Sequence, residues 1–451
     1  MNIVRKIGRI LRATAFFAGA VLCFSCVEKD ENFGIKEQEG VSYNYPGNRI
    51  GHIETRRVLL FYECGFNSLY SYLADNMEDD LEKGYLPSGG RNEDVILIFS
   101  KLAKNANYKD VPSYLRRIYK NAEGKIVSDT LKTYPTSVVA SSGETMRDVL
   151  SYVKVNFPAK GYGMVFSSHG SGWLPAGYYN NPTDFERYHR NSSGAKFSKR
   201  LSDSNIPAGN METDDPFAGM VRSLGQDKMS SGDVEMTVPE FVSGIPFHLD
   251  YLLFDMCFGG GIELIYGLRD KADYLGVSPA EVLAAGMYDY TKLTTFLLNG
   301  PSPDLKGLFQ DSFSRYDKQS GEHRSATVTL IKTDELEGLT SVCKRLVEKY
   351  SYAISHAPTD NIQGYFRLNR HYFYDLEDTF VKCGVSEEDL AELRNAIDRT
   401  IVYKNATPSF LGDFDIETYS GYSMYLPCDG TSLLNSYFKQ EEWNKAVGLV
   451  N

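Results

Sequence analysis

Tyr251-Leu-Leu-Phe-Asp-Met-Cys257 is a short apolar run that ends in an acid and a thiol, and three glycines, Gly259 to Gly261, follow almost at once. Uninterrupted apolar residues over four positions predict a strand that is buried on both faces of a parallel sheet. Open α/β sheets bind their ligands at the carboxyl ends of such strands. We therefore expect the acid and the thiol to lie at a binding site.

A second apolar run ends in a histidine. Gly163-Met-Val-Phe-Ser-Ser-His169 is followed by Gly170-Ser-Gly-Trp173. If the two predicted strands are neighbours, their carboxyl ends bring His169 and Cys257 to the same edge of the sheet. A thiol beside an imidazole base is the arrangement of a cysteine nucleophile.

The rest of the chain predicts an α/β fold. Ser142 is placed to cap a helix whose apolar residues follow the helical period, and Pro158 ends it. Strands are predicted at 57–62, 94–99, 114–119 and 274–278, and helices at 67–81, 144–156, 237–241 and 262–268. Their alternation predicts a mainly parallel sheet with helices on both faces. Residues 286 to about 400 are expected to be largely helical, and 421–427 to form a strand that returns to the sheet.

The N-terminus resembles a bacterial lipoprotein signal. Four basic residues precede the apolar run 13–24, and Ser25 precedes Cys26, the predicted lipidation site. The expected localisation is the bacterial cell envelope, with the chain lipid-anchored to a membrane at the outer membrane or cell surface. The predicted organisation is a signal peptide (1–26), a flexible acidic tether (27–53), an α/β core (54–300) with a polar insertion (174–232), and a helical C-terminal region (301–451).

Charge and cysteine content exclude several classes of protein. A net charge of -11 argues against nucleic acid as a partner, because phosphate binding needs clustered Lys and Arg. Seven cysteines, of which two lie in the signal segment, leave five at wide and irregular spacing. This is neither a disulfide framework nor a zinc-binding pattern, so at least one thiol stays free unless it pairs between chains.

Several sequence blocks together resemble the clostripain family of cysteine peptidases. The histidine block is the most specific, since His-Gly-x-Gly-Trp after an apolar strand is uncommon. The blocks are Asn67-Ser-Leu, Pro158-Ala with the strand to Trp173, Phe254-Asp-Met-Cys257, Val277-Ser-Pro-Ala-Glu281 and Gly421-Tyr-Ser-Met-Tyr-Leu-Pro427. The chain departs from the family pattern at Gly259 and Gly260, where bulkier residues are usual, and at Pro279, where the family has an acid or Gln.

The resemblance implies a caspase-like α/β fold and an endopeptidase that cleaves peptides or proteins after Arg or Lys through a Cys257/His169 dyad. It also implies self-cleavage between the histidine and cysteine blocks, for which Lys196, Lys199, Arg200, Arg222 and Lys228 are candidates. Calcium dependence occurs in the family, but this sequence contains no D-x-[DN]-x-[DN]-G loop.

The residues themselves suggest how the chemistry proceeds. Cys257 attacks the scissile carbonyl to give a thioester, and His169 passes a proton to the departing amine, with no cofactor required. Backbone N–H groups of Gly170 and Cys257 are candidates for stabilising the oxyanion. Asp255 projects to the same side of the strand as Cys257 and is a candidate partner for a basic substrate residue, with Ser278 beside it.

Other interpretations stay open at this point. A cysteine at a strand end is by default inert core, Asp255 could instead cap the following helix, and Cys64 is a rival thiol. A serine hydrolase is another interpretation, but the sequence lacks the G-x-S-x-G motif that carries the nucleophile in such enzymes. The alternative function is a catalytically inactive surface lipoprotein that binds peptides or glycans.

Overall fold

A computed structural model describes residues 55–90, 93–175, 177–178, 224–230, 232–366 and 372–450. The predicted signal peptide with Cys26, the tether and most of the 174–232 insertion lie outside these residues. Four of the five candidate processing residues, all except Lys228, lie outside them too.

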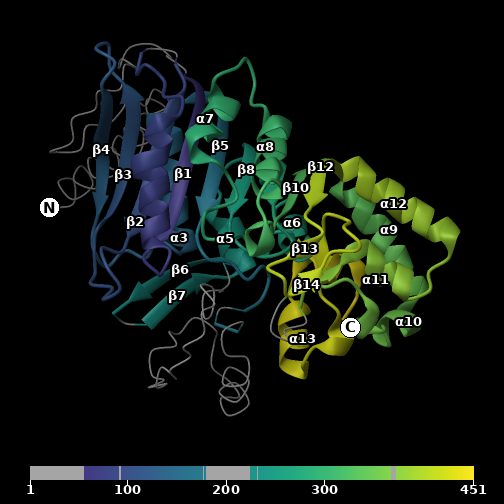
Figure 1. The fold of residues 1–451 in the computed structure, drawn as a ribbon. Helices are drawn as coiled ribbons and strands as arrows, with labels where there is room; N and C mark the ends of the chain where they lie inside the picture. The colour runs from purple at the N-terminus through teal and green to yellow at the C-terminus, as the bar shows by residue number, and fades with distance from the viewer. Residues whose placement is uncertain are drawn as a thin grey trace, which may run out of the picture.

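A nine-stranded sheet runs through the molecule in the order β12-β10-β9-β8-β5-β1-β2-β3-β4 (Figure 1). The five central strands are parallel, and the two strands at each end are antiparallel to their neighbours. The strands are β1 (Thr55–Gly65), β2 (Val95–Leu102), β3 (Ser113–Lys120), β4 (Ile126–Tyr134), β5 (Ala159–Ser167), β8 (Leu249–Asp255), β9 (Ala272–Val277), β10 (Thr327–Lys332) and β12 (Ile401–Ala406). The predicted α/β architecture is confirmed.

The sheet is covered on both faces because its strands alternate between two apolar clusters. Leu60 and Tyr62 of β1 pack with α3 (Gly143–Asn156), α5 (Val238–Gly244) and α6 (Ile262–Gly267). Leu59 and Phe61 face the opposite side. Helices α7 (Tyr290–Leu298) and α8 (Leu305–Asp317), together with the irregular helical segment α2–η1–η2 (Tyr70–Ala74, Asp75–Asp80 and Leu81–Lys83), cover that side.

Helix starts follow the capping residues seen in the sequence. The Ser142 side chain accepts a hydrogen bond from the Thr145 amide at the start of α3. Thr237 and Glu240 form a reciprocal capping box at the start of α5. No helix among the described residues is long and apolar enough to cross a membrane.

The C-terminal part holds further helices gathered beyond the β12 edge of the sheet (Figure 1). They are α9 (Leu336–Lys349), α10 (Ser351–Ser355), α11 (Leu376–Lys382), α12 (Glu387–Thr400), α13 (Ser432–Phe438) and α14 (Glu442–Val447). This region is helical as predicted, but it is not purely helical, since β10 and β12 both belong to the central sheet.

The prediction that 421–427 returns to the central sheet is wrong. Its strand β15 (Ser423–Met424) pairs with β11 (Tyr374–Asp375) in a separate two-stranded sheet. The segment is buried because it packs over the histidine loop, where the Tyr425 ring lies 4.6 Å from that of Trp173. A segment that is buried against a loop needs apolar residues just as a core strand does, so the sequence pattern did not distinguish the two.

Candidate active site

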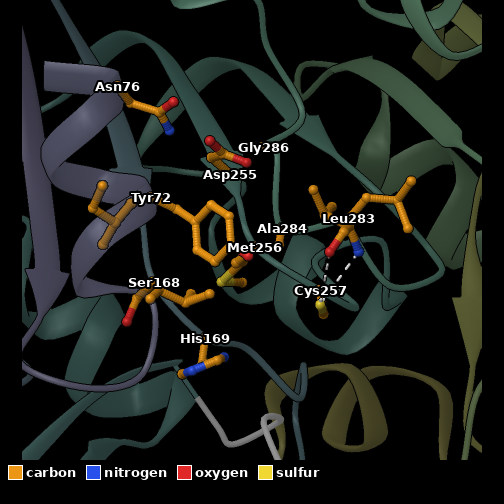
Figure 2. Close-up of a pocket in the computed structure, with 13 residues that line it drawn as sticks. Tyr72, Asn76, Ser168, His169, Asp255, Met256, Cys257, Leu283, Ala284 and Gly286 are labelled. Carbon is orange, nitrogen blue, oxygen red and sulfur yellow. Dashed lines mark hydrogen bonds between the residues drawn. The ribbon is translucent and has the colours of Figure 1, made fainter. Parts of the chain in front are cut away.

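A pocket opens at the carboxyl ends of β5 and β8. His169 follows β5 and Cys257 follows β8, and these two strands are hydrogen-bonded neighbours. The pocket is lined by Leu69, Tyr72, Leu73, Asn76, Ser168, His169, Asp255, Met256, Cys257, Val282, Leu283, Ala284 and Gly286. In Figure 2, Asp255 lies with Asn76 and Gly286 at one end of the pocket and His169 lies at the other, with Cys257 on the side of Leu283. The structure thus brings His169, Cys257 and Asp255 into one cavity.

Cys257 is half-buried, and its sulfur contacts the backbone of the loop opposite. The Val282 amide donates a hydrogen bond to Sγ at 3.2 Å, and the thiol reaches the Val282 carbonyl at 3.7 Å. Phe258, the next residue, has a φ of 56°, a left-handed conformation that is unusual for a bulky side chain. Its ring is held by stacking on Phe373 at 4.3 Å. The chain therefore turns sharply just after the thiol, which leaves the thiol on the pocket wall.

The glycines that follow Cys257 allow a close approach of two loops. A Cβ atom on Gly260 would lie 2.5 Å from the Pro279 nitrogen, so only glycine fits there. The Gly260 amide also donates to the Ser278 carbonyl at 2.8 Å. Two of the positions at which the chain departs from the family pattern, Gly260 and Pro279, are therefore packed against each other.

His169 is buried, with 3% of its surface exposed, and is oriented by a serine from another element. Ser68 Oγ lies 3.0 Å from His169 Nε2. A hydrogen bond to one ring nitrogen restrains the orientation of an imidazole, and directed proton transfer requires such an orientation. Ser68 belongs to the Asn67-Ser-Leu block, but the sequence alone gave it no role, because its contact with His169 joins residues 101 positions apart.

Asn67 fixes the loop that carries Ser68. Its side chain donates to the carbonyl oxygens of Cys64 at 2.7 Å and of Gln226 at 2.9 Å, and it accepts from the Leu69 amide at 2.9 Å. Gln226 lies in β6 (Leu224–Met229), which pairs with β7 (Gly232–Met236). The Gly225 amide in turn donates to the His169 carbonyl at 3.0 Å. The end of β1, the loop that carries Asn67 and Ser68, and strand β6 thus form one hydrogen-bonded network around the histidine loop.

Asp255 forms the inner wall of the pocket. One carboxyl oxygen accepts from the Met287 amide at 2.6 Å and the other from the Tyr290 hydroxyl at 2.9 Å. Burial raises the pKa of Asp255, while these two donors and the Arg315 charge lower it. It does not cap the helix after Cys257, because α6 begins beyond Gly261 without a side-chain cap.

The remaining predicted site residues have different surroundings. Ser278 is fully buried and does not line the pocket, because its hydroxyl bonds to Thr327 Oγ1 at 2.7 Å and to the Ala280 carbonyl at 3.1 Å. Gly170 packs against the cysteine loop, and a Cβ there would lie 2.6 Å from the Cys257 carbonyl oxygen. A glycine at 170 is therefore what lets the histidine and cysteine loops approach.

Cys64 is a poor rival for Cys257. It is fully buried, on the face of β1 opposite to that of Glu63. Burial raises the pKa of the Cys64 thiol well above its usual value, and Asp227 and Glu63 raise it further. Among the described residues, no group of three His, Cys, Asp or Glu side chains converges as a metal site. Cysteine-peptidase chemistry needs no metal or other cofactor.

Comparisons with known proteins match a family model and the overall fold. The Clostripain family model matches residues 209–425. An inactive zymogen C11 protease from Parabacteroides distasonis is similar in structure, with 24% identity, a TM-score of 0.65 and coverage of 88% of this chain and 99% of that one. A secreted C11 cysteine protease from Bacteroides thetaiotaomicron, solved with an irreversible peptide inhibitor, is similar at 22% identity and a TM-score of 0.66, covering 87% and 99%. At these identities the two structures are evidence for the fold. A search of curated proteins finds no match.

Proposed function

Since the chain is a cysteine peptidase of the clostripain family, we propose that Cys257 is its nucleophile, that His169 is its general base and acid, and that it cleaves peptide bonds after Arg or Lys. The observation that carries this proposal is the shared pocket: the thiol, the imidazole and a buried carboxyl line one cavity. The other free thiols among the described residues do not line it.

The reaction follows from the roles of these groups. His169 accepts the thiol proton, and the sulfur of Cys257 attacks the carbonyl carbon of the scissile bond. The C–N bond of the tetrahedral intermediate then breaks, His169 gives its proton to the leaving amine, and a thioester remains on Cys257. Water, deprotonated by His169, then attacks the thioester carbon, the C–S bond breaks to release the carboxylic acid, and His169 returns the proton to the sulfur. Ser68 keeps the ring oriented throughout.

Backbone amides are the proposed donors to the oxyanion. The amides of Gly170 and Cys257 lie on the two loops that meet at the pocket, and Gly170 packs directly on the Cys257 carbonyl. Donors fixed by packing need no reorganisation as negative charge develops, which makes them effective.

Asp255 is the proposed acceptor of a basic substrate side chain. Its carboxyl lies at the inner end of the pocket, where a guanidinium or ammonium group would gain a charge-assisted hydrogen bond. The cavity is small, about 40 Å³, which leaves space for only a few waters. A long side chain therefore enters when a lining residue moves, and Tyr72, 43% exposed, is the most exposed of them.

A panel of fluorogenic peptides tests this function. Peptides that end in Arg or Lys before the fluorophore should be hydrolysed by the wild type and not by Cys257→Ala, whereas Leu and Asp peptides should be left intact. Equal hydrolysis by the wild type and Cys257→Ala would refute the nucleophile, and cleavage of only Leu or Asp peptides would refute the specificity.

The proposed location is the bacterial cell envelope, with a lipid on Cys26 as the membrane anchor. The support is the sequence, in which a basic segment and a short apolar run precede Cys26. Metabolic labelling with an alkyne fatty acid should tag the wild type and not Cys26→Ser. Labelling of both, or of neither in a host that lipidates its lipoproteins, would contradict the anchor.

A further inference from the structure

A row of polar side chains crosses the sheet beside the pocket. In the strand register, Ser100 of β2 lies opposite Glu63 of β1, Glu63 lies opposite Ser167 of β5, and Ser167 lies opposite Asp255 of β8. All four are buried, and the residues two positions earlier on each strand belong to one apolar cluster. The row therefore lies on the face of the sheet that α7 covers, and it ends at Asp255 in the pocket.

Glu63 is the unusual member of this row. It is fully buried, and neither carboxyl oxygen has a hydrogen-bond partner among the described residues. A buried ionised carboxylate without donors is strongly disfavoured. Burial, followed by the charge of Asp255, raises the pKa of Glu63 well above its usual range. Without donors Glu63 is favoured as the neutral acid, whereas the donors Met287 and Tyr290 favour the carboxylate form of Asp255.

Two hydroxyl groups lie between Glu63 and Asp255. Tyr290 Oη donates to Asp255 Oδ2 at 2.9 Å, and Ser167 Oγ lies 3.0 Å from Tyr290 Oη. Because a tyrosine hydroxyl has one proton and Asp255 receives it, Ser167 donates to Tyr290. The charge of Asp255 opposes ionisation of Glu63, so the charge states of the two acids are coupled.

We propose that Glu63 is a second specificity-determining acid, which ionises when a basic substrate side chain pairs with Asp255 and then strengthens the hold on that side chain. This rests on the proposed function of Asp255. In this proposal Glu63 does not contact the substrate. It is a positioning residue that acts through Asp255, by adding negative charge near the bound cation. Binding a cation favours ionisation of a nearby acid, and by linkage ionisation favours binding of the cation.

The charged and titratable groups around Glu63 allow this change. Arg116, on β3, lowers the pKa of Glu63, and its Nε is buried without a partner among the described residues. Tyr290 faces it from α7 and Asp255 from β8. Cys64 follows it on β1 and faces the other side of the sheet. Among the described residues, Asp255 is the group whose charge opposes ionisation of Glu63, and a bound substrate cation neutralises that charge.

The pH dependence of KM tests the inference. KM and kcat for an arginyl peptide are measured from pH 5.5 to 9 for the wild type, Glu63→Gln, Glu63→Leu and Glu63→Asp, with Ser100→Ala as the matched control from the same row. In the wild type and in Ser100→Ala, KM should fall about tenfold as pH rises, because Glu63 becomes ionised. In Glu63→Gln and Glu63→Leu, KM should stay at the high value at all pH values. Glu63→Asp should restore the fall.

The outcomes separate this inference from the proposed function. If the wild type cleaves arginyl peptides and either uncharged variant that folds shows the wild-type fall in KM, Glu63 is only a structural residue and the inference is wrong. If the wild type cleaves only peptides with an uncharged residue before the bond, the role of Asp255 is wrong and the inference falls with it. Two different replacements are used so that the test does not depend on the folding of a single variant. Gln has the shape of Glu, and buried acids often tolerate apolar substitution such as Leu.

Discussion

Ser68 Oγ lies 3.0 Å from Nε2 of His169, so the candidate catalytic histidine is held by a neutral hydroxyl. This hydrogen bond restrains the orientation of the imidazole ring. The loop that carries Ser68 is in turn held by Asn67, so the orientation of His169 depends on the first loop of the sheet.

Ser68→Ala should lower kcat by about 3- to 10-fold and leave KM nearly unchanged, because the ring loses its orientation but the pocket wall does not change. Steady-state kinetics on an arginyl peptide measure this effect. Ser71→Ala, on the exposed side of the same segment, is the control and should behave as wild type. An unchanged kcat in Ser68→Ala would show that the hydrogen bond has no role in positioning His169.

Asp255→Asn should lower kcat/KM for arginyl and lysyl peptides by about 100-fold, because a basic side chain then lacks its buried charged partner. The rate of Cys257 alkylation by iodoacetamide should change little, since iodoacetamide does not use the pocket acid. Asp250→Asn, near the other end of β8, is the matched control. Parallel losses in hydrolysis and alkylation would mean that Asp255 supports the fold of the site and not its specificity.

Self-processing, if it occurs, should take place before residue 224 and not after Lys228. Lys228 lies in β6, where its amide donates to the Phe66 carbonyl at 2.7 Å and its ammonium group lies 4.8 Å from the Tyr108 ring centre. A paired strand is a poor substrate, since cleavage needs an extended and accessible backbone. N-terminal sequencing of fragments from the wild type, with Cys257→Ala as the uncut control, checks this. A new N-terminus at Met229, or identical fragments from both proteins, would contradict it.

Glu263→Gln should become more stable than the wild type as pH rises. Burial raises the pKa of Glu263 to about 7, and its Oε2 has no partner among the described residues. The folded state therefore favours the protonated acid, so wild-type stability falls between the unfolded pKa and about pH 7. From pH 5 to pH 8 the variant should gain about 2–3 kcal/mol relative to the wild type.

Urea unfolding at the two pH values measures this gain. The exposed Glu388→Gln is the control, and it should show no gain with pH. Glutamine keeps the oxygen that accepts from the Tyr425 amide at 2.8 Å, so the comparison isolates the charge. An equal difference between variant and wild type at pH 5 and pH 8 would show that Glu263 is not a buried acid of raised pKa.

Local sequence patterns predicted the central fold well. The apolar runs of β1, β2, β5 and β8 are buried on both faces, and such strands need no information from distant residues to be found. Ser142 and Thr237 predicted helix starts for the same reason, since a cap acts within its first turn. The cysteine and histidine could also be placed, because both follow strands that the topology makes neighbours.

Features that depend on tertiary packing were not predicted. Thr327-Val-Thr-Leu-Ile-Lys332 has the β-branched content of a strand, but helical segments on both sides led to a helical prediction for the whole region. Helix α12 ends at Thr400, and the chain continues as β12 only because β10 offers it an edge. Ser68 and Glu63 acquire their roles through contacts with strands about 100 residues away, which spacing in the sequence does not reveal.

The nucleophile is tested most directly by a peptidyl arginyl chloromethyl ketone, followed by mass spectrometry of the digested protein. One adduct is expected, a thioether on Cys257, which disappears in Cys257→Ala and forms more slowly in His169→Ala. Modification at Cys64 or Cys428 in place of Cys257, in a protein that hydrolyses arginyl peptides, would contradict it.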